Sequence, residues 1–279
     1  GVHSTSSCSV YVNGVLEGID STAGTPEGVG ASLYVGRDTG ATARDFNGSI
    51  DELAIWNTSL TGDEILKIYN RQNTKFGGLY TSSITATPVS SSWTNFKWLS
   101  SLPFYKEFPG DTNADATPDS ESSAEYSGVS ASSGQNLELL WHLNESSWVN
   151  PNYDAIDSSG KNRPGVSGTG TISSAVGKLK GAANLNVANN RIQSAGFDLG
   201  AIGTMSTFAW VKLHVNPPFA GNVGLTSKFV TSGSAFDFYL VSTGALRVSL
   251  SNGGTSHIAL TTTTTFSDWD QWHHVGFTY

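Results

Sequence analysis

Apolar and polar residues alternate in short runs along most of the chain, which predicts strands rather than long helices. The segment 48–57 surrounds an Asp-Glu pair with apolar side chains and is typical of a partly buried strand. Upstream, residues 10–16 hold an Asn-Gly pair between two β-prone runs, which predicts a hairpin.

One short helix is predicted directly after the strand at 48–57. Thr61 and Glu64 form a T-x-x-E capping box, in which each side chain satisfies a backbone N–H at the helix start. Leu60 and Ile65 stand where a hydrophobic staple would pack. The rest of the chain carries no comparable helix signal, so we expect an all-β protein.

Composition agrees with this expectation. Charged residues are only 14% and 31 residues are glycine, which favours turns and strands over helices. With 38% hydrophobic residues, 8 Trp and 13 Phe, the chain can build one large core. No apolar run approaches the ~20 residues that cross a bilayer, so no membrane insertion is expected. Cys8 stands alone, which excludes an internal disulfide and predicts a packed strand residue.

These motifs resemble laminin G-like (LamG/pentraxin-like) domains of the concanavalin A-like lectin/glucanase superfamily. The strand at 48–57 and its helix resemble the C-terminal end of such a domain, and residues 10–16 resemble its Y-V-N-G hairpin. The family's opening strand, its D-S-S-G-x-N loop and two central strands are matched by 137–145, 157–162, 207–212 and 269–279. The resemblance implies a concanavalin A-like jelly-roll β-sandwich.

The order of these motifs predicts a fragment of two tandem copies. Residues 1–73 resemble the C-terminal half of one domain, 74–136 form a connector, and 137–279 resemble the N-terminal half of a second domain. Two isolated half-domains would each expose an apolar face and open sheet edges. We therefore expect them to pack as one circularly permuted sandwich, with Tyr279 near Gly1.

The connector divides into two parts. Residues 80–84 and 93–98 suggest two short strands, in which Trp93 and Trp98 either pack on a neighbouring sheet or form a stacking platform for a sugar. Residues 109–134 read as an acidic, Ser/Asp-rich linker. Six acidic residues and one lysine lie between residues 103 and 136, and no basic cluster occurs anywhere, which excludes nucleic acid as an expected partner.

The linker also carries a pattern similar to calcium loops. Asp111, Asn113 and Asp115 have the D-x-N-x-D spacing, and alternating oxygen ligands let a short loop wrap a hard cation. However, Ala116 stands where an EF-hand needs glycine, and Ser122 where it needs a bidentate Glu. A plain acidic linker is the favoured interpretation.

The family resemblance implies a different calcium site. Many concanavalin A-like domains hold a structural Ca²⁺ near the junction of their first and last strands, through an Asp of the last strand and backbone carbonyls. By resemblance, Asp51 is the side chain for that ion and Asp157 a second candidate. In the alternative interpretation, Asp51 only accepts hydrogen bonds from loop amides.

The sequence does not favour a catalytic function. The superfamily includes glycoside hydrolases, which need two carboxylates about 5 to 9.5 Å apart, but the chain has no E-x-D-x-E run. Asp51 and Glu52 are adjacent, so they are expected on opposite faces of a strand. His142, His273 and His274 fall within predicted strands and favour packing over a metal site.

We therefore predict a noncatalytic extracellular or cell-surface module, bacterial in character, for recognition or adhesion. Its ligand would be a carbohydrate or a protein, and tandem copies would add avidity. A structural spacer repeat is the alternative, and an accessory domain of a glycoside hydrolase comes third. The candidate contacts from the rim loops, each also readable as an ordinary exposed residue, are Arg37, Asp38, Arg44, Trp148, Asn150 and Tyr153.

Overall fold

The structure is a computed structural model that describes part of the 279-residue chain. The described residues are 7–21, 32–38, 44–73, 107–108, 136–148, 154–168, 172–187, 190–195, 197, 203–230, 233–252 and 255–279. Gly1, the strands predicted at 80–84 and 93–98, and the acidic linker at 109–134 lie outside them.

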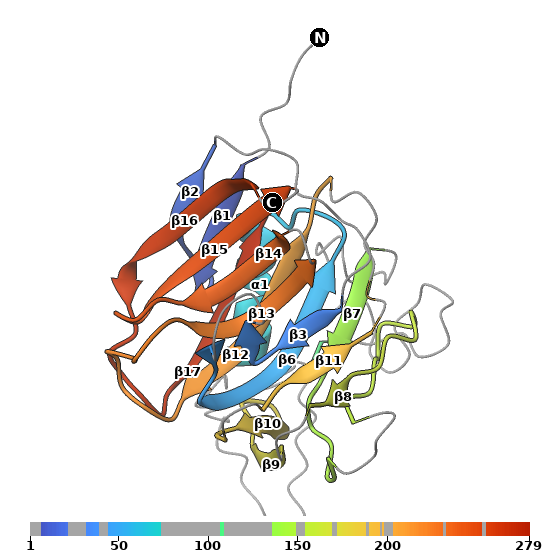
Figure 1. Cartoon of the computed structure of the whole chain (residues 1–279). Helices are drawn as coiled ribbons and strands as arrows, with labels where there is room; N and C mark the ends of the chain where they lie inside the picture. The colour runs from blue at the N-terminus through green and yellow to red at the C-terminus, as the bar shows by residue number, and fades with distance from the viewer. Residues whose placement is uncertain are drawn as a thin grey trace, which may run out of the picture.

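Two antiparallel sheets form a sandwich, which confirms the predicted all-β class (Figure 1). Sheet 1 has the order β2-β1-β17-β12-β6-β10-β9, and β7 also pairs with β6. Its strands are β2 (Val15–Asp20), β1 (Cys8–Val12), β17 (Trp272–Thr278), β12 (Ser206–Leu213), β6 (Gly48–Trp56), β10 (Gly181–Leu185), β9 (Ser173–Val176) and β7 (Leu137–Trp141).

Sheet 2 has the order β16-β15-β14-β13-β3-β11-β8. Its strands are β16 (Thr255–Thr265), β15 (Ala245–Asn252), β14 (Gly233–Leu240), β13 (Val223–Val230), β3 (Leu33–Val35), β11 (Ile192–Ser194) and β8 (Val166–Ser167). A small hairpin, β4 (Arg37–Asp38) with β5 (Arg44–Asp45), completes the strands of the described residues.

The two ends of the chain build this sandwich together. β1 pairs with β17 in a register that sets Ser9 opposite Thr278, and β6 lies between β12 and β10. Figure 1 shows the N-terminal strands β1 and β2 beside the C-terminal strands β15 and β16. The prediction that the N-terminal and C-terminal segments pack as one sandwich is therefore confirmed, while their origin in two tandem copies stays a prediction.

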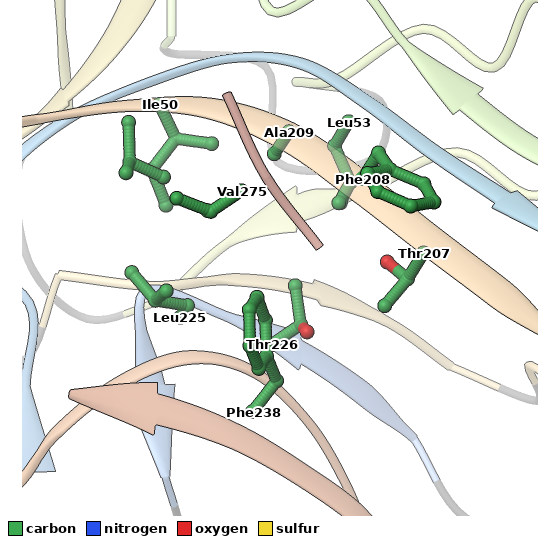
Figure 2. Close-up of a pocket in the computed structure, with 10 residues that line it drawn as sticks. Ile50, Leu53, Thr207, Phe208, Ala209, Leu225, Thr226, Phe238 and Val275 are labelled. Carbon is green, nitrogen blue, oxygen red and sulfur yellow. The ribbon is translucent and has the colours of Figure 1, made fainter. Parts of the chain in front are cut away.

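The core between the sheets is apolar and tightly filled. Figure 2 shows Ile50, Leu53 and Val275 of sheet 1 facing Leu225 and Phe238 of sheet 2. The gap that these side chains line has a volume of about 10 Å³, which is roughly the room of one water molecule. No ligand fits there.

Helix α1 (Gly62–Asn73) covers the outer face of sheet 1. The predicted capping box is present: the Thr61 backbone N–H donates to Glu64 Oε2 at 2.8 Å, and the Glu64 N–H donates to Thr61 Oγ1 at 3.3 Å. Ile65 and Ile68 are buried against Trp56 of β6 in a second apolar cluster. No helix among the described residues is long and apolar enough to cross a membrane.

Candidate functional site

Strand β6 does not alternate regularly, and the irregularity controls the chemistry of the outer face. Ile50 and Leu53 both belong to the inner core, although residues three apart in a regular strand face opposite ways. The pairing with β12 shifts in register at this point, and Glu52 has a φ of 53°. Asp51 and Glu52 therefore both leave the inner face, and the prediction that they point to opposite faces is wrong.

Glu52 lies at the centre of a buried polar network. Its Oε1 is 2.5 Å from His142 Nδ1, and its Oε2 accepts a 2.8 Å hydrogen bond from the Phe108 backbone N–H. Gln72, near the end of α1, donates to the same Oε2 at 3.4 Å and accepts from Trp210 Nε1 at 2.8 Å. The helix, the connector and the sheet thus all hold this one carboxylate.

A second carboxylate reaches this network from the connector. Glu107 Oε1 accepts a 2.5 Å hydrogen bond from Asn144 Nδ2, and Glu107 Oε2 forms a close ion pair with Lys180. Ligand atoms of Glu52, Glu107 and His142 all lie within 4.8 Å of one another. Among the described residues, no other group of three His, Cys, Asp or Glu side chains converges in this way. We call these three residues the acid–histidine cluster.

Burial and charge perturb the titration of the groups in this region. Burial alone would lower the pKa of His142, but the charge of Glu52, the hydrogen bond to it and the charge of Glu107 raise that pKa to about 9. Burial, followed by the charge of Glu52, raises the pKa of Asp51 well above its ordinary value. Two buried carboxylates, Asp51 and Glu52, and the half-buried Glu107 therefore act on one another's charge.

The two aspartates predicted to bind calcium have different surroundings. Asp51 is fully buried; its Oδ2 accepts a 2.8 Å hydrogen bond from the Leu179 N–H, whereas its Oδ1 has no hydrogen-bond partner within the part of the chain that the structure describes. Asp157 accepts from three backbone amides, those of Leu140, Ser159 and Arg163, at 2.8 to 3.1 Å. Asp157 thus stabilises its own loop, and calcium binding by either residue stays a prediction.

An open pocket lies at the end of the sandwich that carries the β1–β2 turn. The predicted Asn-Gly hairpin is present, with φ of 51° at Asn13 and 77° at Gly14. The pocket has a volume of about 440 Å³, within the range of small-ligand sites. It is lined by Val12, Asn13, Val15, Glu17, Thr264, Thr265, Phe266, Ser267, Asp268 and His273. We call it the hairpin pocket.

Aromatic and polar groups meet inside the hairpin pocket. The His273 ring packs edge-on against Phe266, with 4.5 Å between ring centroids, and its Nε2 is 3.0 Å from Asp268 Oδ1. Burial lowers the pKa of His273 although Asp268 opposes that shift, so the ring is neutral at pH 7. Trp269, next to Asp268 in the chain, is 53% exposed. This combination can pack against a ring and hydrogen-bond its substituents.

A smaller pocket of about 320 Å³ opens at the same end of the sandwich, beside the β12–β13 loop. Its wall combines apolar side chains such as Phe219 with amide and carboxylate groups, among them Asn47, Asn222 and Asp45. Asp45 is also 3.5 Å from Arg37 Nε across the β4–β5 hairpin. Arg37, one of the predicted contact residues, thus pairs with a residue of this pocket's wall.

The residues predicted from the rim loops do not gather at one place among the described residues. The backbones of Asp38 and Arg44 are opposite each other in the β4–β5 register, next to the Arg37–Asp45 pair. Trp148 is only 6% exposed, packs in the main core and donates to Ser174 Oγ at 3.2 Å, so the structure places it inside rather than on the rim. Asn150 and Tyr153 lie outside the described residues.

Sequence reasoning missed Glu107 and the hairpin pocket as site features. Glu107 is isolated in an acidic connector, and nothing local marks it as a residue that reaches the sheet. For the pocket, the Asn-Gly turn and the His-His pair are each visible in the sequence, but their adjacency depends on the pairing of β1 with β17.

Cys8 is buried as expected, and burial with the charge of Asp20 raises the pKa of its thiol to about 12.

Comparison with known proteins supports the sandwich family at one end of the chain. Residues 1–66 match the family model Laminin_G_3, described as the concanavalin A-like lectin/glucanases superfamily. No curated protein and no solved structure matches the chain. The match and the two antiparallel sheets together support a concanavalin A-like all-β fold.

Proposed function

We propose that this protein is a noncatalytic recognition module that works outside the cell or at its surface and binds a carbohydrate in the hairpin pocket. The matched superfamily is one of lectins and glucanases, so a binding module agrees with the family at a coarse level. The observation that carries the proposal is the hairpin pocket itself, where aromatic rings and carboxylates converge.

The chemistry of the pocket suits a sugar. Phe266 and the neutral His273 present ring surfaces, against which the C–H face of a pyranose can pack. Glu17 and Asp268 supply carboxylate acceptors for hydroxyl groups, and Asn13 adds an amide. A few convergent polar groups on an apolar base are the usual composition of a specific small-ligand site.

Burial of the carboxylates supports a noncatalytic role. Asp51 and Glu52 lie on the same side of β6, but they are only 0% and 4% exposed. Asp51 is held by Leu179, and Glu52 by Gln72 of α1 and Phe108 of the connector, so this pair is closed to a substrate as large as a glycan. In the hairpin pocket, Asp268 is engaged with His273, and Glu17 accepts a hydrogen bond from Thr264.

A glycan array followed by calorimetric titration of the best glycan tests this proposal. Asp268→Asn removes one charge from the pocket, and Asp270→Asn removes one charge from the same loop outside it. The two side chains are 54% and 58% exposed, so neither change should alter the fold. We expect Asp268→Asn to weaken binding about tenfold or more, because it replaces a charge-assisted hydrogen bond, and Asp270→Asn to have little effect.

Three results would contradict the proposal in different ways. If both variants bind the glycan equally well, the pocket beside the β12–β13 loop would become the candidate binding site instead. Binding of peptides but no glycans would indicate a protein-adhesion module. The absence of any saturable ligand would favour the structural-spacer alternative.

A further inference from the structure

We propose that the acid–histidine cluster, Glu52 with Glu107 and His142, binds a divalent transition-metal ion of the zinc class. The three ligands come from separate parts of the chain: β6, the connector, and the residue that follows β7. Their ligand atoms already lie within 4.8 Å of one another. This site is distinct from the hairpin pocket, and its ligands differ from Asp51 and Asp157, the residues predicted to bind calcium.

The ligand types select the class of metal. Calcium takes six to eight oxygen ligands and has little affinity for imidazole. One imidazole nitrogen with two carboxylate oxygens is instead a set that zinc accepts, with a fourth position for water or another side chain. The participation of His142 therefore favours zinc over calcium at this place.

Asp51 supplies an independent observation. Its carboxylate is fully buried, and Oδ1 has no hydrogen-bond partner among the described residues, which is a costly arrangement for a polar atom. The charges of Glu52 and Glu107 act on this carboxylate, so it stands beside the cluster. Among the described residues, His142 is ion-paired with Glu52, and Lys180 is ion-paired with Glu107. Zinc binds the neutral imidazole, so metal binding would take the place of the proton on His142 and release it to solvent.

Neighbouring groups already orient the ligands. The Phe108 N–H and Gln72 hold one oxygen of Glu52 and leave the other toward His142. Asn144 and Lys180 hold Glu107. Such outer contacts fix ligand geometry in metal sites and affect affinity by about 10- to 100-fold.

A metal ion here would also fasten the connector to the sandwich. Phe108, next to Glu107, is 2% exposed and packs edge-on against Trp56, with 5.4 Å between ring centroids. A metal bond to Glu107 would add a strong contact beside this aromatic one. The inferred role is therefore a structural clamp between connector and sheet.

Titration of the chelator-treated chain with ZnCl₂ in a calorimeter, with CaCl₂ in parallel, tests the site. We expect one Zn²⁺ per chain, not displaced by a large excess of Ca²⁺. Glu107→Gln and His142→Gln should each weaken Zn²⁺ binding tenfold or more. Asp63→Asn, which removes a carboxylate from the exposed start of α1, is the matched control and should leave affinity unchanged.

Cobalt(II) reports directly on the ligands, because its visible absorption depends on imidazole coordination. The bound-Co²⁺ spectrum should change in His142→Gln and persist in Asp63→Asn. If His142→Gln does not fold, the Zn²⁺ affinity of Glu107→Gln tests the site instead, since this substitution removes no apolar contact. Zn²⁺ binding that is unaffected by Glu107→Gln would overturn the proposal, as would no saturable binding, or Ca²⁺ binding that is stronger than Zn²⁺ binding and lost in Asp51→Asn.

Discussion

The two faces of sheet 1 are both buried, yet they are built differently. The inner face packs apolar side chains against sheet 2 and leaves a gap of only about 10 Å³. The outer face, under α1 and the connector, combines a smaller apolar cluster with buried polar groups such as Glu52, Gln72 and His274. The stability of the inner face thus depends on packing. The stability of the outer face also depends on charge and pH and, by our proposal, on a bound metal ion.

The largest expected effect tests the inner face. Phe277 is fully buried and contacts Phe236 and Phe238 edge-on, with ring centroids 6.0 and 5.5 Å apart. Phe277→Ala should lower the free energy of unfolding by about 3–5 kcal/mol, because it leaves a cavity in a close-packed core. Urea unfolding measures this change. Trp269→Ala, at an exposed position, is the control, and a loss below about 1 kcal/mol for Phe277→Ala would contradict a packing-dependent inner face.

A pH-dependent effect of intermediate size tests the outer face. His274 is buried among Tyr69, Phe208 and Trp210, and its Nδ1 has no hydrogen-bond partner in the described ranges. Burial lowers the pKa of His274 to about 3. The unfolded chain binds a proton below about pH 6.5 and the folded one does not, so stability is lost as pH falls. At pH 4.5 the loss should be about 2–3 kcal/mol relative to pH 7.

A matched variant isolates this contribution. His274→Phe keeps an aromatic ring at the position and removes the titration. Urea unfolding at pH 7 and pH 4.5 should show a smaller pH dependence in the variant than in the native protein, by the same 2–3 kcal/mol. An unchanged pH dependence would mean that His274 is not held neutral by burial, and that the outer face is less dry than the contacts indicate.

The smallest expected effect concerns the helix that covers the outer face. Thr61→Ala removes the side-chain acceptor for the Glu64 N–H and should cost about 1 kcal/mol. Lys67→Ala, on the exposed side of α1, is the control and should change stability by less than about 0.5 kcal/mol. If Thr61→Ala leaves the free energy of unfolding unchanged, α1 is not part of the cooperative unit, and the outer face is less integrated than the inner one.

Much of the fold was predictable, but the details of the outer face were not. Alternating apolar runs, the Asn-Gly turn and the T-x-x-E box predicted strands, a hairpin and one helix, and each is present. The bulge at Glu52 was not predicted, because a regular period of two is the default assumption for a strand. Because β6 has one extra residue at this point, Asp51 and Glu52 lie on the same side of the strand, although adjacent residues of a regular strand face opposite ways.

The sequence by itself determined the all-β class and the capped helix, because these follow from local periodicity and turn chemistry. Its resemblance to two halves of a laminin G-like domain, with the need to bury apolar faces, predicted the pairing of the two segments. Only the tertiary structure decided which polar groups meet. Glu107 reaches Lys180 across 73 positions of the chain, and Asn13 reaches His273 across 260. Such meetings depend on strand order and register, which bring distant residues together without leaving a signal in the neighbouring sequence.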